Sequence, residues 1–129
     1  MKELQDFITK AERFLRSAEH PLALGDYDSC ASRWYYAAFF MAEAALMKKG
    51  LTPSFPQSVI RLFGQHFIQT GIFPPALGHI LSRAHDMRPA GDYEVGHAIS
   101  REEAENLLPT VQQFVAEVRI YLEKEGESL

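Results

Sequence analysis

The sequence predicts an all-α protein, and three observations support this class. Apolar residues recur at helical spacing in five separate segments of the chain. No run alternates apolar and polar residues as a half-buried β-strand would, and proline and glycine stand between the segments. At 129 residues, 47% of them hydrophobic, the chain has the size of one domain, 1–129, that forms a helical bundle around a single core.

The first helical segment ends near His20-Pro21, where its pattern stops. Its apolar residues lie three and four positions apart, on one face of a helix: Leu4, Phe7, Ile8, Ala11, Phe14, Leu15 and Ala18. This segment is therefore predicted to cover the core from one side.

The second segment opens after Gly25, where the carboxylate of Asp26 or Asp28 can accept hydrogen bonds from the free amides of the first turn. It runs to Gly50, a residue type that commonly ends helices. Its apolar residues extend beyond one face, so we expect neighbours on more than one side. This segment is predicted to be the central helix of the bundle.

A shorter helix is expected after the link from Pro53 to Pro56, with Gly71 as its stop. The fourth helix begins around Pro74-Pro75, where a missing amide costs nothing, and must end before Pro89. Composition then predicts a loop over 88–100, RPAGDYEVGHAIS.

The last helix opens at a capping box formed by Ser100 and Glu103. Pro109 lies inside this helix and removes the hydrogen bond to the carbonyl of Glu105, at a cost of about 3 kcal/mol, so we expect a kink there. Taken together, the segments are predicted to share one core that includes Trp34, Tyr35, Phe39, Leu62, Leu81, Leu108 and Val115.

The net charge of −4 and the pI near 5.7 restrict the partners of the molecule as a whole. Its overall field repels a phosphate backbone, so any contact with nucleic acid requires a local cluster or a basic partner. A non-specific DNA coat is not expected.

Neither an export signal nor a membrane helix is expected. The start of the chain mixes both charges, without the uninterrupted apolar region of a signal peptide. The uncharged run Trp34–Ala42 falls far short of the roughly 20 residues that a membrane span needs. The single cysteine, Cys30, cannot form an internal disulfide. We therefore expect a cytoplasmic protein.

The sequence predicts no metal site and no other cofactor. Glu94 and His97 form its one Glu-x-x-His motif, whereas a di-iron bundle needs this motif twice, on helices. Neither a zinc motif nor a glycine-rich phosphate loop occurs. On a bundle helix, Cys30 is expected to pack as a small apolar side chain rather than act as a nucleophile.

The order and spacing typical of HEPN domains are found in four stretches, SRWYYAAFFMAEAAL, VIRLFGQHFIQTG, RPAGDYEVGHAIS and REEAENLLPTVQQFVAEV. From about Phe14 to Leu122, the chain resembles the small prokaryotic HEPN proteins that consist of a single domain. This resemblance implies an antiparallel up-and-down bundle of four main helices and one short helix, commonly homodimeric. The resemblance also implies RNA as a partner, because many such domains bind or cut RNA. It implies a partner protein as well, because many such domains form a two-gene toxin–antitoxin pair with a minimal nucleotidyltransferase.

The catalytic HEPN motif separates an arginine from a following histidine by four to six residues, so that arginine binds the phosphate and histidine moves the proton. In this chain the fifth residue after Arg88 is Tyr93, and His97 is nine residues away. The usual ribonuclease motif is therefore absent from its expected place. The alternative is a metal-independent endoribonuclease in which Arg88 holds the phosphate and Tyr93 or His97 transfers the proton.

Arg33 stands at the entrance of a strongly apolar stretch. An unpaired buried charge costs several kcal/mol, so we expect a partner for it and prefer Asp92. The other interpretation is that Arg33 contacts a phosphate or nucleotide together with Arg88. The candidate ligand-binding residues are then Arg33, Tyr36, Arg88 and Asp92.

We therefore expect a HEPN-type module that binds RNA or nucleotide, or that serves as the partner of a nucleotidyltransferase in a two-gene, toxin–antitoxin-like system. A third interpretation, a structural homodimer without a ligand, requires that carboxylates neutralise Arg88.

Overall fold

A computed structural model of the protein describes residues 2–93 and 99–129, and side chains over 3–88 and 99–129. The described residues form α1 (Lys2–Ser17), α2 (Glu19–Leu24), α3 (Tyr27–Lys48), α4 (Pro56–Phe63), the π-helical turn η1 (Gly64–Ile68), α5 (Pro75–Tyr93) and α6 (Arg101–Lys124). The predicted all-α class is confirmed. Among these residues, no helix combines the length and the apolar character that crossing a bilayer requires.

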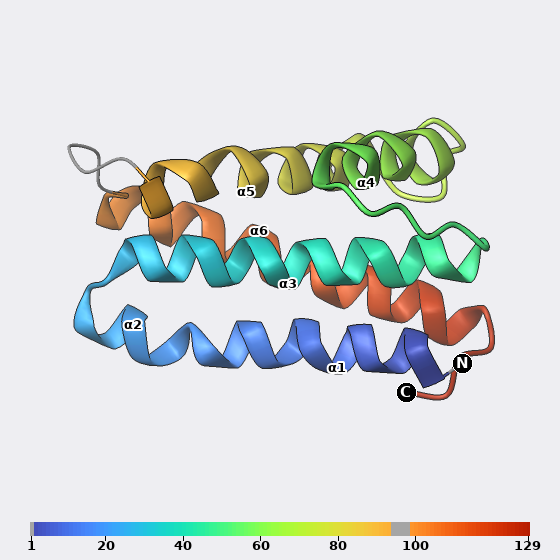
Figure 1. The fold of residues 1–129 in the computed structure, drawn as a ribbon, viewed down its shortest axis with the longest axis horizontal. Coiled ribbons are helices and arrows are strands. Elements are labelled where there is room, and N and C mark those ends of the chain that lie inside the picture. The colour runs from blue at the N-terminus through green and yellow to red at the C-terminus, as the bar shows by residue number, and fades with distance from the viewer. Residues whose placement is uncertain (1, 94–98) are drawn as a thin grey trace.

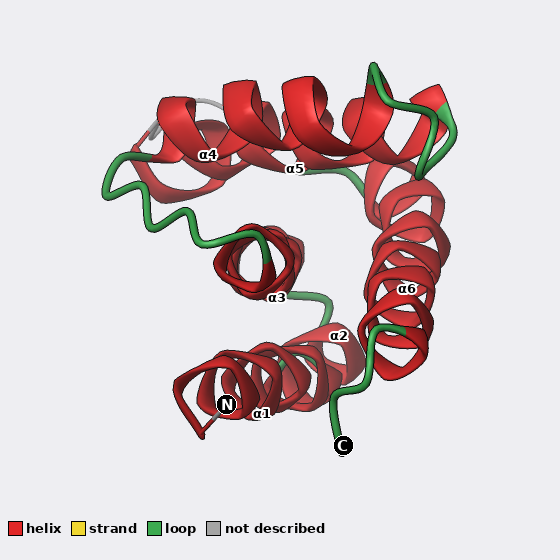
Figure 2. Cartoon of the chain, turned by 90° about the vertical axis from the view of Figure 1, so that its right-hand side faces the viewer, coloured by secondary structure: helices red, strands yellow, loops and turns green. Residues whose placement is uncertain are grey.

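The long helices form an up-and-down bundle with α3 at its centre. Neighbouring pairs α1 and α3, α3 and α5, and α5 and α6 run in opposite directions (Figure 1). Figure 2 shows α1, α5 and α6 on three sides of α3, and no described helix on the fourth side. The expected central position of the second segment is thus confirmed.

Small side chains allow the neighbours of α3 to approach it closely. Six of its alanines are completely buried: Ala31, Ala37, Ala38, Ala42, Ala44 and Ala45. The distance between packed helices depends on the side chains at the contact, so alanine favours close packing. Of the seven predicted core residues, Trp34, Tyr35, Leu81 and Val115 are buried, while Phe39, Leu62 and Leu108 are only partly buried.

The start of α3 is fixed by local capping. Gly25 adopts a left-handed conformation with φ 76°, which ends the short α2. Asp26 caps α3 by accepting a hydrogen bond from the Ser29 amide at 3.3 Å. Asp28 has a different role, since its Oδ1 accepts from the amide of Ile99 at 2.7 Å and ties α3 to the entrance of α6.

The third predicted segment divides into α4 and the turn η1. Gly71 stops it, as predicted, with a left-handed φ of 79°. Phe63 and Phe67 from this segment are buried and pack with Phe73 and Phe114 in one aromatic cluster.

The predicted end of the fourth helix before Pro89 is wrong, because α5 continues through Pro89 to Tyr93. The predicted loop over 88–100 is consequently wrong for its first six residues. Pro89 removes one amide donor, to the carbonyl of His85, but it leaves the contacts of α5 with α3 in place. We infer that this packing outweighs the lost hydrogen bond.

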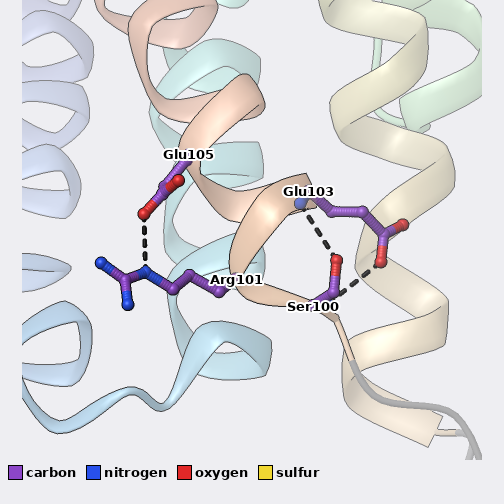
Figure 3. A network of polar contacts seen from close by, with 4 residues as sticks. All are labelled: Ser100, Arg101, Glu103 and Glu105. Carbon is purple, nitrogen blue, oxygen red and sulfur yellow. Dashed lines mark hydrogen bonds and ion pairs between the residues drawn. The ribbon is translucent and has the colours of Figure 1, made fainter.

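The predicted capping box at the start of α6 is confirmed (Figure 3). The hydroxyl of Ser100 accepts from the Glu103 amide at 3.1 Å, and the Glu103 carboxylate accepts from the Ser100 amide at 3.0 Å. The helix then passes through Pro109 to Lys124. Glu105 and Pro109 are both exposed, so water can bond the carbonyl that the proline leaves free. The kink at Pro109 stays a prediction.

The two ends of the described chain lie at the same end of the bundle (Figure 1). The side-chain amide of Gln5 donates to the carbonyl of Ser128 at 2.8 Å. Nearby, the Arg119 guanidinium donates to the Glu12 carboxylate at 2.6 Å, which joins α6 to α1.

Candidate functional site

The candidate site is built around Arg88, near the C-terminal end of α5. Its guanidinium carbon lies 5.0 Å from the centre of the Tyr35 ring on α3, a cation–π distance. Tyr35 is only 2% exposed. Burial raises the pKa of its hydroxyl to about 12, an effect that the nearby charge of Arg88 only partly offsets. The Tyr35 hydroxyl therefore stays protonated at neutral pH, and the ring is a neutral platform for Arg88.

Arg88 is not neutralised by the described part of the chain. No carboxylate there forms an ion pair with it. Its Nε is buried without a hydrogen-bond partner. The interpretation as a homodimer without a ligand requires a neutralised Arg88, and the described side chains do not test it, because that of Asp92 lies outside them.

His85 joins Arg88 at the same ring. The imidazole centre lies 5.5 Å from the centre of Tyr35, and the side chain is 19% exposed. Its Nδ1 is 3.7 Å from the carboxylate of Asp86, which is itself 81% exposed. The sequence-based reasoning missed His85 because it placed Arg88 after the helix. The signal that could have found it is the His-x-x-Arg spacing of 85–88 on one face of a helix.

Aromatic contacts continue from this site along α3 to α1. Tyr36, a predicted ligand-binding residue, lies 5.1 Å from Tyr35 and 5.3 Å from Phe14 of α1, centre to centre. Phe40 continues the chain of contacts, 6.2 Å from Tyr36. The partly buried residues of α3 around these rings recur at helical spacing, and we call them the open stripe: Tyr36, Phe39, Phe40, Glu43 and Met47.

Arg33 is only partly buried, so its setting is less apolar than the sequence suggests. Its Nη1 donates to the carbonyl of Ser29 at 3.2 Å, within α3. The side chain of Asp92, its predicted partner, lies outside the described side chains. The pair of Arg33 and Asp92 therefore stays a prediction.

The other predicted site residues cannot be placed around Arg88. Tyr93 is the last residue of α5, and its side chain lies outside the described part. Glu94 and His97 lie outside the described residues altogether.

Neither metal chemistry nor a reactive thiol finds support in the described geometry. In the described ranges, no three His, Cys, Asp or Glu side chains gather as a metal site would require. Cys30 is completely buried, its thiol donates to the Ala18 carbonyl at 3.5 Å, and burial raises its pKa. A buried, protonated thiol is a poor nucleophile, as expected from the sequence.

A family model of the HEPN domain matches residues 4–121 of this chain. The chain belongs to the HEPN domain family. This assignment confirms the resemblance drawn from the sequence motifs, and the match begins earlier than expected, within α1.

Relatives and a solved structure agree with the HEPN assignment. "Putative toxin MJ0142" from Methanocaldococcus jannaschii is 32% identical over 121 residues, which cover 94% of this chain and 82% of that protein. "UPF0332 protein glr0978" from Gloeobacter violaceus is 32% identical, over 88% of this chain and 90% of that protein. The crystal structure of TT1696 from Thermus thermophilus has the same fold, with a TM-score of 0.76 at 22% identity, over 92% of this chain and 98% of that one.

Proposed function

We propose that this HEPN protein binds RNA or a nucleotide through Arg88 and acts with a minimal nucleotidyltransferase in a two-gene, toxin–antitoxin-like system. The observation that carries the binding proposal is the guanidinium of Arg88, supported by Tyr35 and without a carboxylate partner in the described part of the chain. A guanidinium fork forms charge-assisted hydrogen bonds with phosphate oxygens. The word "toxin" in the names of two relatives supports the proposed context.

The proposed binding is local, since the whole molecule carries a net charge of −4. Few phosphates are then contacted, and the affinity is expected to depend only weakly on salt concentration. A strong salt dependence would instead indicate an extended basic surface.

The test is fluorescence anisotropy of a single-stranded RNA labelled at its 3′ end. Losing charge-assisted hydrogen bonds, each of about 1.5–3 kcal/mol, predicts a roughly 10- to 100-fold weaker affinity for Arg88→Ala. Arg83→Ala is the matched control, because Arg83 is an exposed arginine on the same helix, and its affinity is expected to stay within about twofold of the wild type. Equal losses in the two variants would contradict the proposal.

The proposed partner is tested by co-expression with the proteins that the adjacent genes encode, among which we expect a minimal nucleotidyltransferase. A stable complex in size-exclusion chromatography supports the proposal. Independent elution of the two proteins at micromolar concentration contradicts the proposed partner and leaves the proposed RNA binding untested.

We also propose a homodimer in which the open stripe of α3 is covered by a second copy. The stripe presents three partly buried aromatic rings. One side of α3 is covered by no described helix (Figure 2). Beside Met47, at its end, lies a hollow of about 470 Å³ that also touches Phe7 of α1. Aromatic residues and methionine are enriched in protein interfaces.

Light scattering tests the homodimer. Phe39→Asp is expected to shift the mass toward the monomer value of 14.6 kDa, whereas Ile120→Asp, at an exposed position on α6, is expected to leave it unchanged. Thermal melts of both variants establish that they are folded. A wild-type mass of 14.6 kDa at micromolar concentration would exclude the dimer.

The alternative, a metal-independent endoribonuclease, needs a proton carrier beside Arg88. His85 is a described candidate for that position. No histidine stands at the usual motif spacing after Arg88. We therefore expect RNA cleavage in EDTA to be about 10²- to 10⁴-fold slower than it would be with a histidine in that place. Efficient cleavage that disappears in both Arg88→Ala and His97→Ala would favour the enzyme instead, as would cleavage that disappears in Tyr93→Phe alone.

A further inference from the structure

We propose that His85 and Arg88 together form a binding site for a phosphate monoester, such as the phosphate of a nucleoside monophosphate or the 5′-phosphate end of an RNA. The inference rests on the proposed function only in its use of Arg88 as a phosphate ligand. It adds a second ligand group, His85, and a preference for a terminal phosphate over an internal one.

The position of the two side chains follows from their spacing on α5. Residues three apart on a helix are neighbours on one face. Here that face meets Tyr35, which lies 5.0 Å from the guanidinium carbon of Arg88 and 5.5 Å from the centre of the His85 ring. One buried ring thus contacts both nitrogen-bearing groups.

Both groups remain accessible to a ligand. The His85 side chain is 19% exposed, and Arg88 is only partly buried. The Nε of Arg88 is buried without a partner, so we assign the contact with a ligand to the two terminal nitrogens. The Asp86 carboxylate, 3.7 Å from His85 Nδ1, is 81% exposed, so water screens its charge and it does not close the site to an anion.

The donor set suits a terminal phosphate better than a diester. A phosphate monoester carries about −1.5 to −2 charge at pH 7 and offers three strong acceptor oxygens. A phosphodiester carries one negative charge and has only two non-bridging oxygens. The fork of Arg88 satisfies two oxygens, and a ring N–H of His85 can donate to the third, which a diester lacks. Tyr35 adds no opposing charge, because its hydroxyl stays protonated.

Two pairs of matched ligands test the preference. The first pair is AMP, a monoester, and 3′,5′-cyclic AMP, a diester with the same base and sugar. The second pair is one RNA oligonucleotide with a 5′-phosphate and the same oligonucleotide with a 5′-hydroxyl. Affinities are measured by isothermal titration calorimetry at pH 7 with the wild type, His85→Gln, Arg88→Gln and His79→Gln. His79 is the matched control, because it is an exposed histidine on the same helix.

We expect the wild type to bind the monoester of at least one pair about tenfold or more tightly than its partner. His85→Gln is expected to lose this preference while it keeps the weaker binding, and His79→Gln is expected to keep both. A preference in the RNA pair alone identifies an RNA end as the ligand, and a preference in both pairs identifies the phosphate group itself. Either result supports the site.

The result that overturns the inference alone is an unchanged preference in His85→Gln, or no preference in the wild type, while Arg88→Gln still abolishes binding. If Arg88→Gln binds every ligand like the wild type, or the wild type binds none of them, the proposed function fails as well. Thermal melts establish that each variant is folded, so a loss of binding reports on the site.

Discussion

Glu43, on the open stripe of α3, is expected to make the stability of this protein fall as the pH rises. It is a partly buried carboxyl, and this burial raises its pKa from an ordinary value of 4.5 to about 7, although Lys10 nearby acts in the opposite direction. Between these two values the native state keeps a proton that the unfolded state releases. Unfolding then becomes easier with rising pH, and the effect is complete above about pH 7.

The size of this loss in the free energy of unfolding follows from the difference between the two pKa values of Glu43. Without screening by water, the difference corresponds to roughly 3 kcal/mol. We expect about half of that, because water screens a carboxyl that is only partly buried. Glu43→Gln keeps the shape of the side chain and removes the charge. It is therefore expected to match the wild type near pH 5 and to be more stable by about 1–2 kcal/mol at pH 8.

The assay is thermal unfolding followed by circular dichroism at pH 5 and pH 8, at one protein concentration. For a chain of this length, the expected gain at pH 8 is a melting temperature higher by roughly 3–8 °C. Glu19→Gln is the control, because Glu19 is exposed, and it is expected to show no such dependence. A difference between Glu43→Gln and wild type that is the same at both pH values would refute the reasoning.

Three further predictions concern the fold. Ser100→Ala removes one half of the capping box of α6 and is expected to cost about 1 kcal/mol in chemical denaturation. Phe114→Ala empties a fully buried position, 5.3 Å from the ring of Phe63, and is expected to cost about 3–5 kcal/mol in the same experiment. If Arg33 pairs with Asp92, then Arg33→Ala combined with Asp92→Ala is expected to cost less than the sum of the two single changes. The first expectation is contradicted if Ser100→Ala is as stable as the wild type, and the second if Phe114→Ala costs less than about 1 kcal/mol. Strictly additive losses in the double-mutant cycle would contradict the third.

Helix boundaries that depend on local chemistry could be predicted from the sequence. Asp26 and Ser100 cap α3 and α6 as expected, because a capping side chain bonds an amide only two or three residues away. Gly71 is the expected stop for the same kind of reason, since a left-handed residue favours glycine whatever surrounds it.

Features that depend on contacts between distant segments could not be predicted in this way. Pro89 is a helix breaker by local rules, yet α5 continues through it while packed against α3. That error also hid His85 as a member of the site, because His85 and Arg88 share a face only if the helix includes both. Both side chains contact Tyr35, about fifty residues earlier in the chain, and no local pattern of residues predicts this contact.

The meeting of the two chain ends has a practical consequence for engineering this protein. The Gln5 side chain bonds the Ser128 carbonyl at 2.8 Å, so a short Gly-Ser linker is expected to join the ends without displacing α1 or α6. New termini in the link between α3 and α4 would then give a circular permutant with the same bundle. The C-terminal part of α5 lies at the opposite end of the bundle (Figure 1), so a fluorophore or an affinity handle on either end of this chain stays remote from Arg88.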